Sequence, residues 1–258
     1  MGAQLALDLG RAGYAVGLID ASPRGLAHAA EQLRDEGWPY VAVEADVADE
    51  DMVRTAFSRV NDGLGPPWAL LATAGVLSGQ FLVDMEAAHF SRVLGVNLYG
   101  TLYSNREAAR YMIANGGGRI VNWSSVAASR ASAGYSAYCA SKSAVESLTR
   151  CFAVELGGYG ITVNAIAPGS TDTAMVGYLD DAARNATILR IPVQRWGTPA
   201  DMSAAASFLI TDAASFISGA VLPVDGGLLA STGGEVNLAA SEQRITIEHA
   251  YQVARRID

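Results

Sequence analysis

Tyr138 and Lys142 are the residues of this sequence whose types and spacing most directly suggest chemistry. They stand four positions apart in the segment 138–157, whose pattern predicts a helix, so both side chains share one helical face. A nearby ammonium favours the phenolate and lowers the pKa of a tyrosine from its usual value of about 10. A phenol tuned in this way serves as a general acid or base near neutral pH. The pair alone is weak support, because a solvated helical face produces the same spacing in many helices.

Two polar residues upstream strengthen this interpretation. Ser125 ends the predicted strand 119–125, "RIVNWSS", and Asn97 lies in "LGVNLYGT". With Tyr138 and Lys142, they resemble the catalytic asparagine, serine, tyrosine and lysine of the short-chain dehydrogenase/reductase family. The resemblance runs from Gly2 to about Gly227 and includes five further motifs in the family's order: "VEADVAD" (43–49), "ATAG" (72–75), "NAIAPGSTDT" (164–173), "RWGTPADM" (195–202) and "GAVLPVDGG" (219–227).

The resemblance implies an NAD(P)-dependent oxidoreductase that interconverts a secondary alcohol and a ketone by hydride transfer. In this family pattern Tyr138 is the general acid/base, and Ser125 holds the same substrate oxygen. Lys142 binds the nicotinamide ribose and lowers the pKa of Tyr138, while Asn97 positions a water in a proton relay. Because the hydride belongs to the nicotinamide, the protein supplies geometry and electrostatics.

The predicted choice of cofactor depends on Asp20, which closes the predicted strand 14–20. A carboxylate at this place accepts hydrogen bonds from both ribose hydroxyls and repels a 2′-phosphate, which favours NAD over NADP. The alternative is that Asp20 or Ser22 caps the next helix, and both roles are compatible because they use different lone pairs. The resemblance implies further cofactor contacts from Asp46, Val47, Ala74, Gly75, Tyr138, Lys142, Pro168, Gly169, Thr171 and Thr173.

Short apolar runs alternate with amphipathic stretches along the chain and predict an α/β fold. Most of these runs are continuously apolar, as strands covered on both faces are. We therefore expect a doubly wound, Rossmann-like parallel sheet in a single domain, 1–227, followed by a C-terminal extension, 228–258. In the extension, 244–250 alternates like a strand but fits a capped amphipathic helix slightly better. The expected strands are 14–20, 40–46, 68–75, 119–125, 161–169 and 220–227, with helices near 22–37, 49–64, 86–114, 138–157 and 199–211.

The connection 170–196 follows the carboxyl end of a predicted strand, where ligands of open α/β sheets bind. It carries Met175 and Tyr178, which we expect to contact the substrate together with Ser125. These side chains indicate a partly apolar substrate without identifying it. The other interpretation is a surface helix with ordinary core contacts.

The first residues predict a helix that runs directly into the strand 14–20. In the family that the chain resembles, a strand and a "TGxxxGxG" turn precede this helix, and the turn holds the pyrophosphate. Met1 and Gly2 align with the end of that turn. We expect the place of the first strand to be filled, because each unsatisfied group on a buried strand edge costs about 1–3 kcal/mol. Three explanations stay open: the natural chain continues upstream of Met1, the C-terminal extension supplies a strand, or the protein is a non-redox enzyme or ligand-binding protein that has lost normal dinucleotide binding.

Composition argues against several classes of function. A net charge of −8 disfavours nucleic acid, which needs clustered basic residues. The sequence has no stretch near the roughly 20 apolar residues of a membrane span and no signal-peptide pattern. Cys139 and Cys151 lie too far apart on one predicted helix to form a disulfide, which indicates a reducing cytoplasm. We expect no metal site, and the resemblance implies a homotetramer or homodimer through helices near 97–114 and 138–157.

Overall fold

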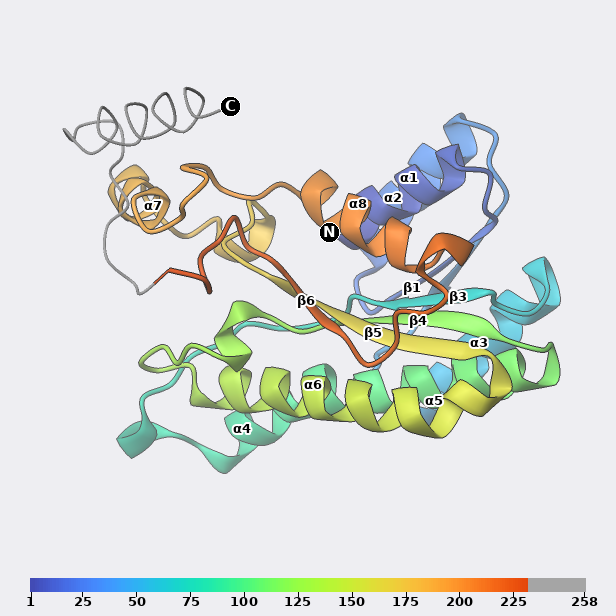
Figure 1. Ribbon diagram of the computed structural model, residues 1–258, viewed down its shortest axis with the longest axis horizontal. Helices are drawn as coiled ribbons and strands as arrows, with labels where there is room; N and C mark the ends of the chain where they lie inside the picture. The colour runs from blue at the N-terminus through green and yellow to red at the C-terminus, as the bar shows by residue number, and fades with distance from the viewer. Residues whose placement is uncertain (232–258) are drawn as a thin grey trace, which may run out of the picture.

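The computed structural model describes residues 1–231, in which helices and parallel strands alternate (Figure 1). The segment 244–250 and the predicted extension from 232 onward lie outside the described residues. The strands form two sheets, and every pair of neighbours is parallel. One sheet pairs β1 (Val16–Asp20) with β2 (Tyr40–Glu44), and the other has the order β3 (Ala69–Ala72), β4 (Gly118–Trp123), β5 (Ile161–Pro168), β6 (Val221–Val224).

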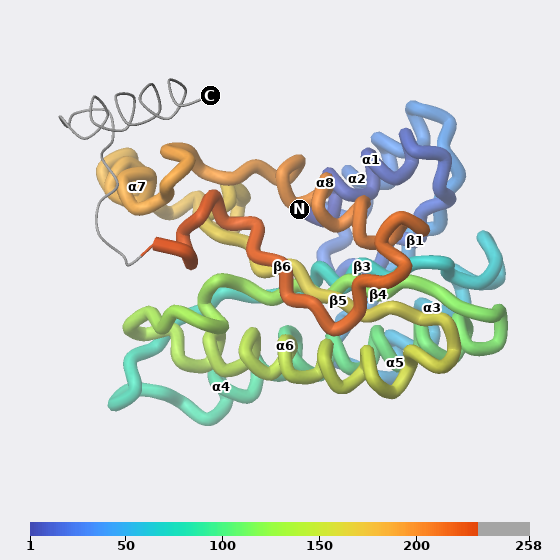
Figure 2. The backbone as a smooth tube through the Cα atoms, viewed as in Figure 1, coloured from blue at the N-terminus to red at the C-terminus, as the bar shows by residue number. Residues whose placement is uncertain are grey.

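Helices cover both faces of the strand layer, as the doubly wound prediction requires. Figure 1 shows α1, α2 and α8 above the strands and α3, α4, α5 and α6 below them, and the tube in Figure 2 follows the same path. The bounds are α1 (Gly2–Arg11), α2 (Pro23–Asp35), α3 (Glu50–Leu64), α4 (Ala87–Leu94), α5 (Gly100–Ala114), α6 (Ser136–Leu156), α7 (Asp181–Ile188) and α8 (Pro199–Leu209). The predicted Rossmann-like α/β fold is therefore confirmed.

The core lies between each helical layer and the strands. Above the strands, Leu5 of α1 and Leu209 of α8 pack with Trp123 of β4. Below them, Met112 of α5 packs with Ile161 of β5 and with residues of α3. All residues of β4 and β5 are buried, so the mostly apolar sequences that predicted these strands reflect cover on both faces.

Side-chain caps fix where several helices begin. The Ser22 hydroxyl accepts from the amide of Gly25 and caps α2, so the cap is Ser22 rather than Asp20. Thr198 and Asp201 form a reciprocal capping box at the start of α8. Since α8 covers the sheet from above, this cap also fixes the end of the long connection that precedes it.

One predicted helix is interrupted at Asn97, a predicted catalytic residue. The segment predicted as a single helix, 86–114, consists of α4, a π-helical turn at Gly95–Tyr99, and α5. Asn97 lies in this turn and its side chain is completely buried. Such π-turns are uncommon and are frequent at functional sites, because the extra residue redirects a side chain.

Of the four strands that have a partner on one side only within residues 1–231, β1 and β3 are the two between which the sequence predicts a further strand. β1 pairs with β2 on one side and β3 pairs with β4 on one side, while no described strand lies between β1 and β3. Most residues of both strands are only half-buried or exposed, in contrast to β4 and β5. Side chains join the two sheets instead, because Leu18 and Leu71 pack against the same core cluster. The expected occupant of this place is therefore not seen in residues 1–231.

We expect the backbone amides of β1 and β3 to exchange hydrogen about tenfold faster, or more, than those of β4 and β5. Each of the first two strands has a partner on one side only, and a missing ladder hydrogen bond is worth about 1 kcal/mol per group. Native-state hydrogen exchange followed by mass spectrometry measures this directly. Equal protection in all four strands would contradict an open edge in solution.

Candidate active site

The structure brings the four predicted catalytic residues together near the carboxyl ends of β3 and β4. Ser125 follows β4, and its Oγ accepts a hydrogen bond from the amide of Ala127 at 3.1 Å. Tyr138 and Lys142 occupy successive turns at the start of α6, with Lys142 buried at 4% exposure. Asn97 approaches them from the π-helical turn. Chain segments distant in sequence therefore supply one cluster.

Tyr138 is a half-buried phenol that hydrogen-bonds Ser125. Burial raises the pKa of Tyr138 above its ordinary value, and the hydrogen bond to Ser125 opposes this rise. The expected lowering of this pKa by Lys142 is therefore not seen in the free protein, because loss of water around the phenol outweighs the other effects. At neutral pH the free protein keeps Tyr138 protonated.

Lys142 is held by a backbone carbonyl rather than by a carboxylate. Its Nζ donates to the carbonyl oxygen of Trp123 at 2.7 Å and lies 5.8 Å from the centre of the Tyr138 ring. Burial lowers the pKa of Lys142 to about 8. The side chain is still protonated at pH 7, so a positive charge faces the Tyr138 ring there.

Gly75 lies beside both Lys142 and Asn97, and its lack of a side chain keeps the space next to these two residues open. A Cβ atom at this position would lie 3.4 Å from Lys142 Nζ and 3.3 Å from Asn97 Oδ1. Asn97 also clamps the chain after β3, because it accepts from the amide of Val76 at 2.8 Å and donates to its carbonyl at 3.0 Å. Its second N–H donates to Ser141 Oγ on α6 at 3.0 Å. The Asn97 amide thus joins the loop after β3 to the helix that carries Tyr138.

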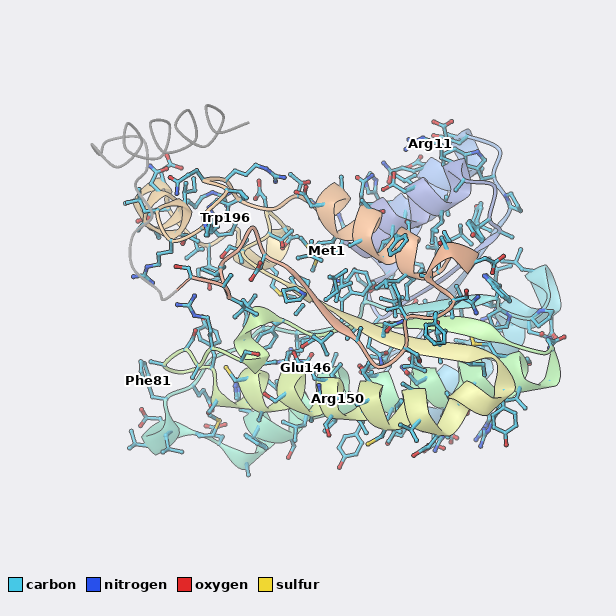
Figure 3. The ribbon with its side chains drawn as sticks, in the orientation of Figure 1. Met1, Arg11, Phe81, Glu146, Arg150 and Trp196 are labelled. Carbon is cyan, nitrogen blue, oxygen red and sulfur yellow. The ribbon has the colours of Figure 1, made fainter. Side chains whose placement is uncertain are left out.

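One residue at the back of the cluster, Glu146, was missed by sequence reasoning. The hydroxyl of Ser124 donates to Glu146 Oε1 at 2.8 Å, and Figure 3 places Glu146 on α6, one turn before Arg150. Glu146 continues the face of Tyr138 and Lys142 at the next helical turn, and this spacing was the available signal. The contact fixes the end of β4 against α6, which sets the position of Ser125.

The predicted NAD-selecting residue stands exposed at the end of β1. Asp20 Oδ1 accepts from the amide of Ser22 at 2.7 Å, while its other oxygen has no hydrogen-bond partner within residues 1–231. Nearby, the start of α1 lies against the loop after β3, since a Cβ on Gly2 would be 3.0 Å from Thr73 Oγ1. A free carboxylate oxygen and a glycine-lined approach to Lys142 at Gly75 are features that a nicotinamide dinucleotide fits.

The other predicted cofactor residues lie in loops after β2, β3 and β5. Asp46 and Ala74 are exposed, and Asp46 Oδ1 accepts from the amide of Ala48 at 2.9 Å. Thr171 Oγ1 donates to the carbonyl of Gly169 at 3.0 Å, which shapes the turn after β5. Val47 and Thr173 also lie in loops that follow the carboxyl ends of parallel strands, and Pro168 is the last residue of β5.

The connection after β5 carries the predicted substrate residues on its exposed side. Met175 lies in a short 3₁₀ turn, Ala174–Val176, at 39% exposure, and Tyr178 is 66% exposed. Farther along, Arg184 of α7 forms an ion pair with Asp172 at 2.9 Å and lies 4.6 Å above the ring of Trp196. The connection is thus anchored at Asp172, before Met175 and Tyr178, and at Arg184, after them.

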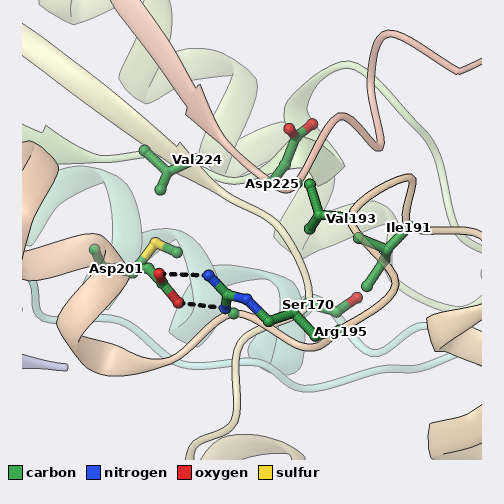
Figure 4. A pocket seen from close by; sticks show the side chains of 10 residues that line it. Ser170, Ile191, Val193, Arg195, Asp201, Val224 and Asp225 are labelled. Carbon is green, nitrogen blue, oxygen red and sulfur yellow. Dashed lines mark hydrogen bonds and ion pairs between the residues drawn. The ribbon is translucent and has the colours of Figure 1, made fainter.

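A small cavity of about 170 Å³ lies between this connection, α8 and the end of β6. Figure 4 shows its central contact, the paired hydrogen bonds of Arg195 to Asp201 at 2.7 and 2.8 Å. The Arg195 guanidinium holds the pKa of Asp201 well below its usual range. The charges satisfy each other, so the motif "RWGTPADM" serves here to attach the connection to the capped start of α8.

No helix within residues 1–231 has the length and apolar character needed to cross a membrane. Within the same residues, no group of three or more histidine, cysteine or acidic side chains is arranged to hold a metal ion.

Comparisons with known proteins agree with the geometry. A family model described as enoyl-(acyl carrier protein) reductase matches residues 1–229. The chain is 38% identical over 231 residues to cis-4-hydroxycyclohexanecarboxylate dehydrogenase of Sinomonas cyclohexanicum, covering 89% of this chain and 92% of that protein. It is 33% identical over 231 residues to a 3-oxoacyl-(acyl-carrier-protein) reductase of Pseudomonas aeruginosa, covering 90% and 94%.

The solved structures give the same result. A gluconate 5-dehydrogenase from Burkholderia cenocepacia, in complex with NADP and tartrate, superposes with a TM-score of 0.85 at 33% identity. The match covers 90% of this chain and 91% of the other. Fold, active-site cluster and relatives therefore agree, and the chain belongs to the short-chain dehydrogenase/reductase family of oxidoreductases.

Proposed function

We propose that the protein is an NAD-dependent oxidoreductase that interconverts a secondary alcohol and a ketone, with Tyr138 as the general acid/base. The observation that carries this proposal is the cluster of Ser125, Tyr138 and buried Lys142 beside the glycine-lined space at Gly75. Relatives named as dehydrogenases and reductases support the same class of reaction.

Ser125 and Tyr138 hold the substrate oxygen between them, because their hydroxyls already meet in the free protein. In oxidation the substrate hydroxyl gives its proton to Tyr138 Oη, and in reduction Tyr138 Oη gives a proton to the carbonyl oxygen. The bound nicotinamide supplies the hydride chemistry that balances either direction. As the phenol loses its proton, the ammonium of Lys142 stabilises the phenolate across the ring.

The proposed dinucleotide site follows the loops at the same edge of the sheet. Asp20 accepts from the ribose hydroxyls through its free carboxylate oxygen, which favours NAD, and Lys142 binds the nicotinamide ribose. Further contacts are proposed from Asp46, Val47, Ala74, Gly75, Tyr138, Pro168, Gly169, Thr171 and Thr173, and substrate contacts from Ser125, Met175 and Tyr178.

Asp20→Ala is expected to lower the ratio of kcat/KM with NAD to kcat/KM with NADP by about 10- to 100-fold, the worth of hydrogen bonds to a charged group. The ratio is measured from the absorbance of the reduced cofactor under matched conditions. Asp35→Ala, which removes an exposed carboxylate at the far end of α2, is the matched control. An unchanged ratio in Asp20→Ala would remove Asp20 from cofactor selection.

The same assay tests the proposed reaction with a panel of cyclohexanol, cis-4-hydroxycyclohexanecarboxylate and a 3-hydroxyacyl thioester. Turnover of any of these with NAD supports the proposal. Absence of both turnover and NADH binding, the latter measured by calorimetry, would contradict it. That result would favour the alternative, a non-redox enzyme or a ligand-binding protein, for which the unpaired edges of β1 and β3 are the supporting observation.

We also propose that the protein works as a homotetramer or homodimer in the cytoplasm. Exposed apolar side chains on the helices below the sheet support assembly there, including Tyr99, Ile113 and Val154. Tyr99 stacks on Tyr103 beside α5, which gives this surface a fixed aromatic element.

A further inference from the structure

Arg130 lies in the loop between β4 and α6, and its backbone is fixed close to Ser125 near the start of that loop. The amide of Arg130 donates to the carbonyl of Val126 at 2.9 Å, which closes one helical turn directly after Ser125. The carbonyl of Ala128 in this turn accepts from the hydroxyl of Ser143 on α6 at 2.8 Å. A helical turn of four residues rises about 6 Å and one residue step spans about 3.8 Å. The Cα atoms of Arg130 and Ser125 are therefore no more than about 10 Å apart.

The Arg130 side chain passes close to the carboxyl end of β5. Its Nη1 donates to the carbonyl of Leu228 at 2.9 Å, in the segment that follows β6, and Figure 1 shows this segment and the loop before α6 on the left of the view. In the sheet, β5 lies between β4 and β6, so the contact joins the segments on either side of β5. The segment after β6 also packs on the end of β5, since a Cβ on Gly169 would be 2.7 Å from Asp225 Cα. Ligands of open α/β sheets bind at this edge.

The charge of Arg130 has no carboxylate partner within residues 1–231. Leu228 engages one N–H group at Nη1, and the other guanidinium N–H groups make no hydrogen bond in the same part of the chain. By contrast, Arg184 and Arg195 of the connection after β5 each form an ion pair with an aspartate. The Arg130 side chain is half-buried and held by a neutral carbonyl. It is therefore a positioned cation whose charge is not neutralised by these residues.

We infer that Arg130 binds a carboxylate carried by the substrate, so that the protein acts on hydroxy acids and the corresponding oxo acids. Because Leu228 engages Nη1, Nε and Nη2 keep the paired N–H groups that fit the two oxygens of a carboxylate. The chain carries a net charge of −8, so an anionic substrate depends on a local cation. The distance from Ser125 suits a carboxylate on the far side of a cyclohexane ring from the reacting carbon. This inference rests on the proposed oxidoreductase function and names the substrate class of the same site.

The test compares cis-4-hydroxycyclohexanecarboxylate with its neutral amide, cis-4-hydroxycyclohexanecarboxamide, as substrates with NAD, in the wild type and in Arg130→Gln. Glutamine keeps an N–H donor for the carbonyl of Leu228 and removes the charge. We expect the ratio of kcat/KM for the carboxylate to that for the amide to fall about 10- to 100-fold, the worth of hydrogen bonds to a charged group. The loss should appear in KM rather than kcat, because the carboxylate is remote from the reacting carbon.

Arg59→Gln is the matched control for this substitution. It makes the same change of net charge at an exposed position of α3 and should leave the ratio of the two substrates unchanged. An unchanged ratio in Arg130→Gln would overturn the inference, since the arginine would then only join the loop to the segment after β6.

Binding without turnover separates this inference from the proposed function. Cyclohexanecarboxylate lacks the hydroxyl that reacts, and calorimetry measures its Kd with the wild type and with Arg130→Gln. We expect the Kd to be about 10- to 100-fold larger for the variant. If the wild type oxidises neither alcohol, the proposed function fails while this binding still decides the role of Arg130. No binding to the wild type, or an equal Kd for both proteins, would overturn the inference.

Discussion

Tyr138→Phe is expected to lower kcat by about 10²- to 10⁴-fold, the usual contribution of a positioned general acid/base. The variant lacks only the hydroxyl that, in the proposed mechanism, exchanges a proton with the substrate oxygen, and the ring still fills its half-buried site beside Lys142. KM should change much less than kcat, because the lost interaction acts mainly as the proton moves. Steady-state kinetics with NAD and the best alcohol of the panel measures both constants.

The control for this loss is a tyrosine outside the active site. Tyr159→Phe removes an exposed hydroxyl after α6 and should leave kcat unchanged within about twofold, as surface substitutions usually do. Thermal unfolding by circular dichroism should place both variants near the wild type. Near-normal turnover in a folded Tyr138→Phe would exclude Tyr138 as the acid/base.

The prediction of the fold succeeded where burial imposes a pattern on the sequence. Strands β4 and β5 are buried along their whole length, so their sequences are mostly apolar, although Arg119, Asn122, Thr162 and Asn164 are buried in them as well. The meeting of Ser125 with Tyr138 was expected from the family resemblance, and the topology accounts for it, because Ser125 closely follows a parallel strand and Tyr138 lies in the first turn of the next long helix. Connectivity in a parallel sheet places such residues at one edge.

Contacts between distant segments could not be predicted in the same way. A helical period runs through 86–114 with or without the π-turn that buries Asn97, so the sequence showed one helix. The direction of the Tyr138 pKa shift depends on how much water the fold excludes, which spacing does not report. A hydrogen bond between Tyr135 and Tyr178 joins two irregular segments, where no periodicity constrains a partner.

Between β1 and β3 the structure differs from the sequence-based expectation in another way. Backbone satisfaction predicted an occupant there, and the described residues contain none. Packing of Leu18 and Leu71 into a shared cluster supplies cohesion through side chains, and the strands themselves become partly exposed. The backbone groups of these edges are therefore accessible to water or to a further strand, and hydrogen exchange is the direct measure of which applies.

Lys142 is expected to titrate near pH 8 in the folded protein, since burial lowers its pKa to about 8. It is the only lysine in the sequence, so lysine labelled with ¹³C at Cε gives a single side-chain resonance to follow by NMR. The same resonance in urea-unfolded protein is the matched control and should titrate near the ordinary value of about 10.4. A folded-state midpoint at the ordinary value would show that the ammonium is hydrated rather than buried.

The same shift makes stability depend on pH in a defined direction. Below pH 8 Lys142 is charged in both the folded and the unfolded state, so folding bears the full free-energy cost of burying the ammonium. Between about pH 8 and 10.4 the folded state has released a proton that the unfolded state keeps. Stability therefore rises with pH through this window.

Lys142→Met lacks the titrating group, so the unfolding free energy of the wild type should gain roughly 2 to 3 kcal/mol relative to this variant between pH 7 and pH 10. Urea unfolding at the two pH values measures this difference, and a constant difference would contradict a buried, protonated Lys142. Turnover by Lys142→Met should fall at least about 10²-fold at every pH, because the phenolate of Tyr138 loses its neighbouring cation.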